Sequence, residues 1–218
     1  MKKVVLIGDS IKFQYQNYVQ TALTDVAQIL TPEDSARFSV NTLRFIYEWK
    51  ENGKWGDYVD VVHYNVGLWD MLYMYGDDKP LTDKDTYVNN VLKIDKQLKR
   101  LFPKAKIIFA NCTSVKNHLY KEWWFKRRNA TVEEYNDAVV TALKENSDTI
   151  INDMFSYTKD LPDEYYKDPT HFSDPLGIEY VGKRITLVIS DALGIDSSAL
   201  KDASGTKVKK VDDLTFGK

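Results

Sequence analysis

Serine, histidine and aspartate, the residue types of a nucleophilic triad, occur in this chain at positions that a hydrolase could use. Ser10 follows Gly8 and Asp9, directly after a short run of aliphatic residues that is typical of a buried strand. A serine hydroxyl is a poor nucleophile unless a base takes its proton, and a histidine oriented by a carboxylate is the usual base. The chain has three histidines, so the candidates for that base are few.

One of the three histidines has a carboxylate at a useful spacing. His63 lies within an apolar run and is predicted to be a hydrogen-bonded histidine of the sheet, and His118 has no acidic residue just before it. His171 follows Asp168 by three residues in a turn-like segment. This spacing lets the carboxylate fold back onto imidazole Nδ1 and leaves Nε2 free to face a serine. We therefore predict a catalytic triad of Ser10, Asp168 and His171.

Each of these motifs also has a purely structural interpretation. Asp and Ser both favour the N-cap of a helix, so residues 8–10 are equally typical of a turn that starts the next helix. Asp168 precedes a proline, and Asp-Pro is a common turn. Asp174 is an alternative partner for His171, although its place before Pro175 favours capping of the final helix.

The elements that must position these residues alternate along the chain. Strands are predicted at residues 4–8, 27–30, 59–65, 107–111 and 149–151, and helices at 14–23, 39–50, 86–102, 131–145 and 176–193. Thr131 and Glu134 have the spacing of a capping box. This alternation predicts an α/β fold with three layers, a flavodoxin-like and mostly parallel five-stranded sheet between helices. Reactive groups in such sheets lie at the carboxyl ends of strands, where Ser10 is expected.

The bulk composition restricts the class of protein. The length of 218 residues favours a single domain, which is expected over residues 1–195. The formal net charge of −2 gives no attraction to nucleic acid or anionic membrane. The polar tail over 196–218 is predicted to hold a short strand at 208–214 or to be partly disordered. The basic cluster at 126–128 is predicted to be a solvated loop edge.

Cysteine and histidine usage predicts no metal and no cofactor. The single cysteine, Cys112, cannot form an internal disulfide and is expected to be a buried residue at a strand end. No Cys partner or HExxH spacing accompanies the histidines. The N-terminal apolar run is too short for a signal peptide, and no run has transmembrane length, so a cytoplasmic protein is expected.

The motifs resemble the sequence blocks of the GDSL esterases and lipases, the SGNH hydrolases. Gly8-Asp9-Ser10 is similar to their first block and Asp168-x-x-His171 to their fifth. Their third block, GxND, is replaced here by NxGLWD at 65–70, which resembles a variant found in one branch of the family.

The resemblance implies roles for the remaining site residues. Asn65 would donate its amide to the oxyanion, Gly67 would permit the turn, and Asp70 would brace that turn or cap the element that follows. The family's second block is a glycine whose N–H is a further donor, but residues 31–39 contain no glycine. By position the donor would be the N–H of Ala36 or Arg37, with Arg37 preferred. The N–H of Ser10 is the remaining donor, Gly8 would permit the backbone turn, and Asp9 would brace it.

The function implied is hydrolysis of a small-molecule ester through an acyl-enzyme. The aromatic segments 68–85 and 114–129 are candidates for binding walls, and we predict a short acyl group such as acetyl on a carbohydrate. An acyltransferase with the same triad, a flavodoxin-like protein that binds a small ligand or nucleotide, and an inactive carbohydrate-binding relative are the alternatives. The sequence predicts no oligomeric state.

Overall fold

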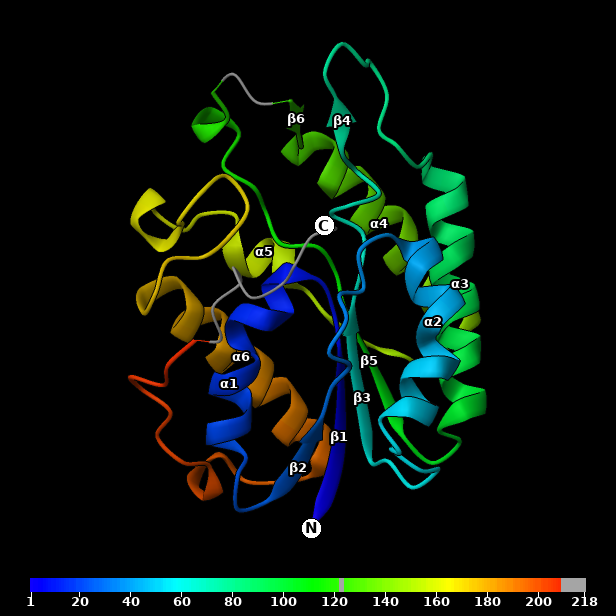
Figure 1. The fold of residues 1–218 in the computed structure, drawn as a ribbon, viewed down its shortest axis with the longest axis vertical. Coiled ribbons are helices and arrows are strands. Elements are labelled where there is room, and N and C mark those ends of the chain that lie inside the picture. The colour runs from blue at the N-terminus through cyan, green and yellow to red at the C-terminus, as the bar shows by residue number, and fades with distance from the viewer. Residues whose placement is uncertain (122–123, 209–218) are drawn as a thin grey trace.

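A five-stranded sheet forms the centre of the molecule in the computed structural model, which describes residues 1–121 and 124–208 (Figure 1). The strands are β1 (Lys2–Ile7), β2 (Ala27–Leu30), β3 (Val61–Asn65), β5 (Lys106–Ala110) and β7 (Ile150–Asn152). Their order is β2-β1-β3-β5-β7, and every neighbouring pair is parallel. The predicted parallel sheet is confirmed.

Helices cover both faces of this sheet. On one face α1 (Ser10–Ala22) packs against α6 (Leu176–Leu193), and on the other α2 (Ser39–Asn52), α3 (Lys84–Leu101) and α4 (Asn129–Asn146) pack in succession (Figure 1). Both faces of β1 are therefore covered, and its residues from Val4 to Ile7 are fully buried. This explains why the strand is a continuous apolar run with no polar alternation. The predicted three-layer α/β/α class is confirmed.

Short elements lie above the carboxyl ends of the strands. A small antiparallel pair joins β4 (Tyr73–Met74) to β6 (Phe125–Lys126). The other short elements at this edge are α5 (Met154–Thr158) and the 3-10 turns η1 (Asn117–Leu119) and η2 (Asp163–Tyr165), whereas the 3-10 turn η3 (Ser197–Ala199) lies at the opposite end of the sheet (Figure 1). Together β4 and β6 bring the two aromatic segments into contact over this edge of the sheet.

Two predicted helix caps are wrong. Helix α4 begins at Asn129, so Thr131 lies inside its first turn, and the Thr131 hydroxyl forms a 2.7 Å hydrogen bond with the Tyr73 hydroxyl. The Asn129 side chain bonds both backbone groups of Val115, which fixes the earlier start of the helix. Helix α6 begins at Leu176, and Pro175 is its cap residue instead of its first helical residue.

The first part of the C-terminal tail packs on the domain. The Lys201 N–H donates to the Ala22 carbonyl at 3.0 Å, and the Gly205 N–H donates to Glu179 Oε1 at 2.7 Å. The predicted strand at 208–214 lies, apart from Val208, outside the described residues. None of the described helices combines the length and the apolar composition that crossing a bilayer requires.

His63 is buried in β3 without the hydrogen bonds expected of it. Its side chain is fully buried, and neither ring nitrogen has a partner among the described residues. The nearest aromatic ring, that of Tyr15, meets it edge-on with a centroid separation of 6.4 Å. The prediction of a hydrogen-bonded sheet histidine is therefore wrong.

This burial makes the stability of the fold sensitive to acid. Burial lowers the pKa of His63 to about 3, whereas an unfolded histidine titrates near 6.5. Between these values the unfolded chain binds more protons at this residue than the folded chain does. The contribution of His63 to the free energy of unfolding is therefore fully present well above pH 6.5 and is lost as the pH decreases. The share of His63 in the loss between pH 7 and pH 5 is about 2 kcal/mol.

We expect the His63→Leu variant to lose this part of the pH dependence. Urea unfolding at pH 7 and at pH 5 gives the change in the free energy of unfolding between these pH values for each protein. The change in wild type is then compared with the change in the variant. His118→Leu is the matched control, because His118 is exposed. Equal pH dependence in wild type and His63→Leu would show that His63 is not the group responsible.

Candidate active site

Ser10 lies where β1 gives way to α1, at the carboxyl edge of the sheet. Asp9 is the N-cap of α1, and its Oδ1 accepts a 3.0 Å hydrogen bond from the Ile11 N–H. Ser10 is the first residue of the helix, so it begins four residues before the predicted start. The helix-start interpretation of residues 8–10 and the placement of a reactive serine are thus both satisfied by one geometry.

Gly8 is needed for close packing. A Cβ atom at Gly8 would lie 2.2 Å from Asn65 Oδ1 and 2.6 Å from the Cβ of Lys12. Its φ is not in the left-handed region that favours glycine. The requirement for glycine therefore comes from the approach of β3 and α1 to its Cα.

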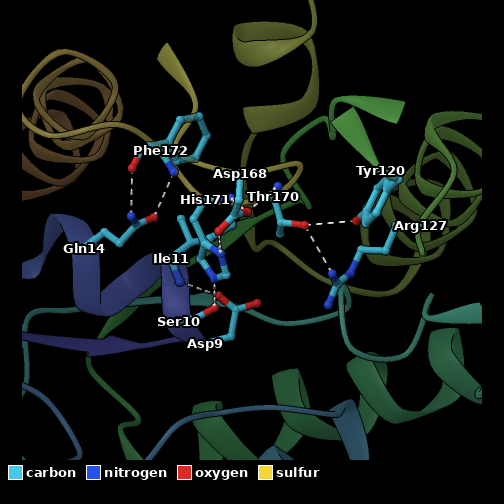
Figure 2. Close-up of polar contacts among 10 residues, drawn as sticks. All are labelled: Asp9, Ser10, Ile11, Gln14, Tyr120, Arg127, Asp168, Thr170, His171 and Phe172. Atoms are coloured by element: carbon cyan, nitrogen blue, oxygen red, sulfur yellow. Dashed lines mark hydrogen bonds and ion pairs between the residues drawn. The ribbon is translucent and has the colours of Figure 1, made fainter. Parts of the chain in front are cut away.

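The three predicted triad residues meet in a continuous chain of hydrogen bonds (Figure 2). Ser10 Oγ lies 2.7 Å from His171 Nε2, and His171 Nδ1 lies 2.8 Å from Asp168 Oδ2. A proton on Nδ1 satisfies the contact with Asp168 and leaves Nε2 as an acceptor for the serine proton. These distances are those of a nucleophile, a general base and the group that orients the base.

Asp168 is held as a carboxylate by the loop in which it lies. Its Oδ1 accepts hydrogen bonds from the N–H groups of both Thr170 and His171 at 2.8 Å. Burial alone would raise the pKa of Asp168, but these bonds and that from the imidazole outweigh it and lower the pKa to about 2. Asp168 is therefore ionised at neutral pH. The exposed Asp174 makes no hydrogen bond or ion pair with His171 among the described residues.

Gln14 fixes the histidine loop to the helix that carries Ser10 (Figure 2). Its Nε2 donates to the Phe172 carbonyl at 2.9 Å and its Oε1 accepts from the Phe172 N–H at 3.1 Å. Gln14 is one helical turn beyond Ser10 and Phe172 follows His171, so this pair of bonds holds the loop of His171 close to Ser10. We regard Gln14 as a positioning residue that the sequence did not reveal.

Gly67 and Asp70 shape the segment that follows β3. Gly67 has a φ of +141°, and a Cβ there would lie 2.6 Å from the Tyr87 hydroxyl and 2.7 Å from Cys112 Sγ. Asp70 is fully buried and accepts hydrogen bonds from the Ser39 N–H at 2.8 Å and the Ser39 hydroxyl at 2.6 Å. Burial raises the pKa of Asp70, although the bonds from Ser39 oppose it. Asp70 thus anchors the start of α2 to this segment.

The backbone at Arg37 has the conformation that a glycine would favour. Arg37 has a φ of +47°, in the left-handed region, and it follows directly on Ala36. The Ala36 N–H donates to the Gly8 carbonyl at 3.0 Å, so it already has a partner within the fold. The Arg37 N–H makes only a 3.4 Å contact with Ser35 Oγ. Of the two predicted backbone donors, Arg37 therefore has the longer hydrogen bond within the fold.

Asn65 is not brought to the same cavity as Ser10. It ends β3 as predicted, but its Oδ1 accepts a 3.4 Å hydrogen bond from the Tyr15 hydroxyl and packs against Gly8. It lines a small cavity of about 20 Å³ below the site, together with Tyr15, Leu68 and Cys112. Cys112 is buried at the end of β5, as predicted.

A cavity of about 560 Å³ opens beside Ser10 and His171. Most of its wall is aliphatic or aromatic, and much of it comes from the two aromatic segments that were candidates for binding walls. The lining residues are Asp9, Ser10, Phe38, Leu68, Trp69, Leu72, Met74, Leu81, Tyr120, Phe125, Arg127, Asp168, Pro169, Thr170 and His171. The triad therefore faces a largely apolar space with a few polar groups.

Arg127 is part of this wall and is not a solvated residue. Only 7% of its surface is exposed. Its Nε donates to the Leu68 carbonyl, and its Nη1 donates to Thr170 Oγ1 at 3.2 Å. The Tyr120 hydroxyl lies 3.0 Å from the same Thr170 oxygen. The prediction of a solvated loop edge is wrong at this residue, because its side chain is held in the cavity wall by hydrogen bonds to Leu68 and Thr170.

The described residues offer no metal centre beside the triad. No group of three or more His, Cys, Asp or Glu side chains within 1–121 and 124–208 is arranged to hold an ion. The polar side chains that line the cavity include those of the triad, Asp9, Tyr120, Arg127 and Thr170.

Comparison with known proteins identifies the fold. No known family model matches the chain, and no curated protein matches it in sequence. A lipase/acylhydrolase from Enterococcus faecalis is 17% identical over 96% of this chain and 100% of its own, with a TM-score of 0.67.

Two esterase structures are similar to the same extent. An acetyl xylan esterase is 17% identical over 86% of this chain and 99% of its own, with a TM-score of 0.66. A carbohydrate esterase of family 3 from Talaromyces cellulolyticus is 17% identical over 90% of this chain and 100% of its own, with a TM-score of 0.64. The chain therefore has the three-layer α/β/α fold of the SGNH hydrolases.

Proposed function

We propose that this protein is a serine ester hydrolase with Ser10 as its nucleophile. The observation that carries the proposal is the hydrogen-bonded chain from Ser10 through His171 to Asp168 at the wall of a cavity. The similar structures are described as lipases, acylhydrolases and acetyl esterases, which supports the same class of reaction.

In the first half-reaction Ser10 Oγ attacks the ester carbonyl while His171 Nε2 takes the hydroxyl proton. The tetrahedral intermediate collapses when the same nitrogen returns that proton to the leaving alcohol, which gives an acyl-serine. In the second half-reaction a water molecule attacks the acyl-serine, and His171 again takes and returns the proton. Asp168 stays ionised throughout and holds the imidazole with its Nδ1–H toward Oδ2.

The oxyanion of each intermediate needs hydrogen-bond donors, each of which contributes roughly 3–4 kcal/mol in a well-studied hydrolase. We propose the N–H groups of Ser10 and Arg37 for this role. Two observations support Arg37 over Ala36. The backbone of Arg37 is in the left-handed region, and the Ala36 N–H already donates to the Gly8 carbonyl. Asn65 stays a third candidate by its sequence resemblance, although its amide oxygen is engaged with Tyr15 and its side chain lines another cavity.

We propose a short acyl group, such as acetyl, as the part transferred to Ser10. An acetyl group fills only a small part of a cavity of about 560 Å³, so the remaining space would take the alcohol part of the ester. Aromatic walls such as those of Trp69 and Phe125 suit a ring, and a sugar ring is one such group.

A fluorophosphonate probe tests the nucleophile directly. We expect one probe per protein molecule, attached at Ser10, when the labelled protein is digested and analysed by mass spectrometry. Hydrolysis of 4-nitrophenyl acetate should exceed that of 4-nitrophenyl decanoate. Labelling that persists at another residue in the Ser10→Ala variant would contradict the proposal.

The same experiment separates a ligand-binding protein from an enzyme. A phosphate bound at the start of α1 would meet the carboxylate of Asp9, which already accepts the Ile11 N–H. The geometry therefore favours the hydrolase. Addition of an alcohol acceptor to the assay distinguishes an acyltransferase, because a transferase forms the new ester at the expense of free acid.

A further inference from the structure

We propose that Arg127 binds an anionic group of the ester substrate, a carboxylate or a phosphate, inside the cavity that Ser10 lines. This inference rests on the proposed ester hydrolysis, and it specifies the chemical class of the substrate. The juxtaposition that carries it is a buried guanidinium in the same apolar wall as the nucleophile.

The charge of Arg127 has no counter-ion among the residues that the structure describes. Among residues 1–121 and 124–208, no carboxylate oxygen lies within 4.0 Å of its nitrogens. Its two hydrogen bonds go to neutral oxygens, those of Leu68 and Thr170. A guanidinium that is more than nine-tenths buried without an acidic partner is costly, and a bound anion would compensate it.

Part of the Arg127 guanidinium remains available to a ligand. Nε and Nη1 have partners, whereas Nη2 has none among the described residues. In Figure 2 the side chain extends from the end of β6 toward Thr170 and the side of the site on which Asp9 and Ser10 lie. An arginine with a free edge suits a planar carboxylate or a phosphate better than a lysine does, because its donors lie in a fixed fork.

The cavity wall also carries two carboxylates, those of Asp9 and Asp168, and both accept hydrogen bonds from backbone N–H groups. Asp168 is also paired with His171. The anion would therefore lie on the Arg127 side of the cavity, whose wall also includes the apolar residues Phe125 and Leu68. There its hydrogen bonds to Arg127 face little competition from water.

The test compares esters that differ only in the charged group. On the alcohol side, 4-acetoxybenzoate is compared with 4-acetoxybenzamide. On the acyl side, mono(4-nitrophenyl) adipate is compared with 4-nitrophenyl 5-carbamoylpentanoate. Since a hydrogen bond to a charged group accounts for about a ten- to hundredfold preference, we expect at least one anionic ester to exceed its neutral match in kcat/KM by about that factor.

The Arg127→Gln variant should abolish that preference and bring the ratio of the two esters close to one. Thr170→Val is the control for a merely structural role, because it removes the Thr170 hydroxyl that Arg127 and Tyr120 contact and keeps the charge. We expect Thr170→Val to alter both esters by a common factor and to preserve their ratio. A ratio near one in the wild type, or the same ratio in Arg127→Gln, would overturn the proposal.

A binding measurement keeps this site separate from the hydrolysis. Calorimetric titration with 4-acetamidobenzoate and 4-acetamidobenzamide, which carry an amide in place of the ester, needs no turnover. We expect the carboxylate to bind at least about tenfold more tightly in wild type and to lose this advantage in Arg127→Gln. Selective binding without ester turnover would refute the esterase and retain the anion site. Turnover without selectivity would do the reverse.

Discussion

Replacement of Ser10 by alanine is expected to lower kcat/KM for 4-nitrophenyl acetate by about 10⁴- to 10⁶-fold, the range seen when the nucleophile of a serine hydrolase is removed. The reason is that no covalent intermediate can form without Oγ. In this variant His171 Nε2 has no hydroxyl to deprotonate, because Ser10 is its hydrogen-bond partner in the described structure. Initial rates under substrate saturation and at low substrate measure the loss.

The matched control is Ser156→Ala, which removes an exposed hydroxyl. We expect it to keep the wild-type rate. The thermal midpoint of Ser10→Ala should stay within a few degrees of the wild-type value, since Ser10 Oγ makes one hydrogen bond and its loss leaves no strained contact. A loss of less than tenfold in Ser10→Ala would exclude Ser10 as the nucleophile.

Replacement of Asp168 by asparagine is the second change with a large expected effect, a loss of about 10⁴-fold in kcat. An asparagine can still accept the N–H groups of Thr170 and His171 through Oδ1, so the loop keeps its shape. Its amide then donates to Nδ1 and favours the tautomer with a proton on Nε2. That nitrogen can no longer accept the proton of Ser10, because it already carries one.

Asp174→Asn is the control for this variant. Asp174 was the alternative partner of His171 by sequence, and it is exposed in the structure. We expect this variant to retain nearly the full kcat, as measured with the same ester at neutral pH. The opposite pattern, a large loss in Asp174→Asn and a small one in Asp168→Asn, would reassign the residue that orients the base.

The sequence was sufficient for the parts of this protein that depend on local patterns. The central strand β1 is a short apolar run from Val4 to Ile7, as expected of a parallel strand that is buried on both faces. The contact between Asp168 and His171 is also local, because the two residues are three positions apart in one loop. Ser10 was identifiable because the end of β1 and the start of α1 meet at that residue.

The residues that the sequence did not reveal act over long distances. The partner of Gln14 is 158 residues away, so no local pattern could indicate it. Arg127 lies between two other basic residues, which favoured exposure, but it contacts Leu68 and Thr170, which are distant from it in the sequence. His63 was expected to have a hydrogen-bond partner, but neither of its ring nitrogens has one among the described residues. Tertiary packing decides each of these cases.

The bonds between Gln14 and Phe172 also have a consequence for synthesis of the chain. The serine is made among the first residues, whereas the base and its anchor are made near the end. A growing or truncated polypeptide therefore displays a hydroxyl with no imidazole to deprotonate it, whatever part of the sheet has already formed. The ability to cleave a bond would arise in one step, when the C-terminal third docks onto the first helix, and incomplete chains would be inert.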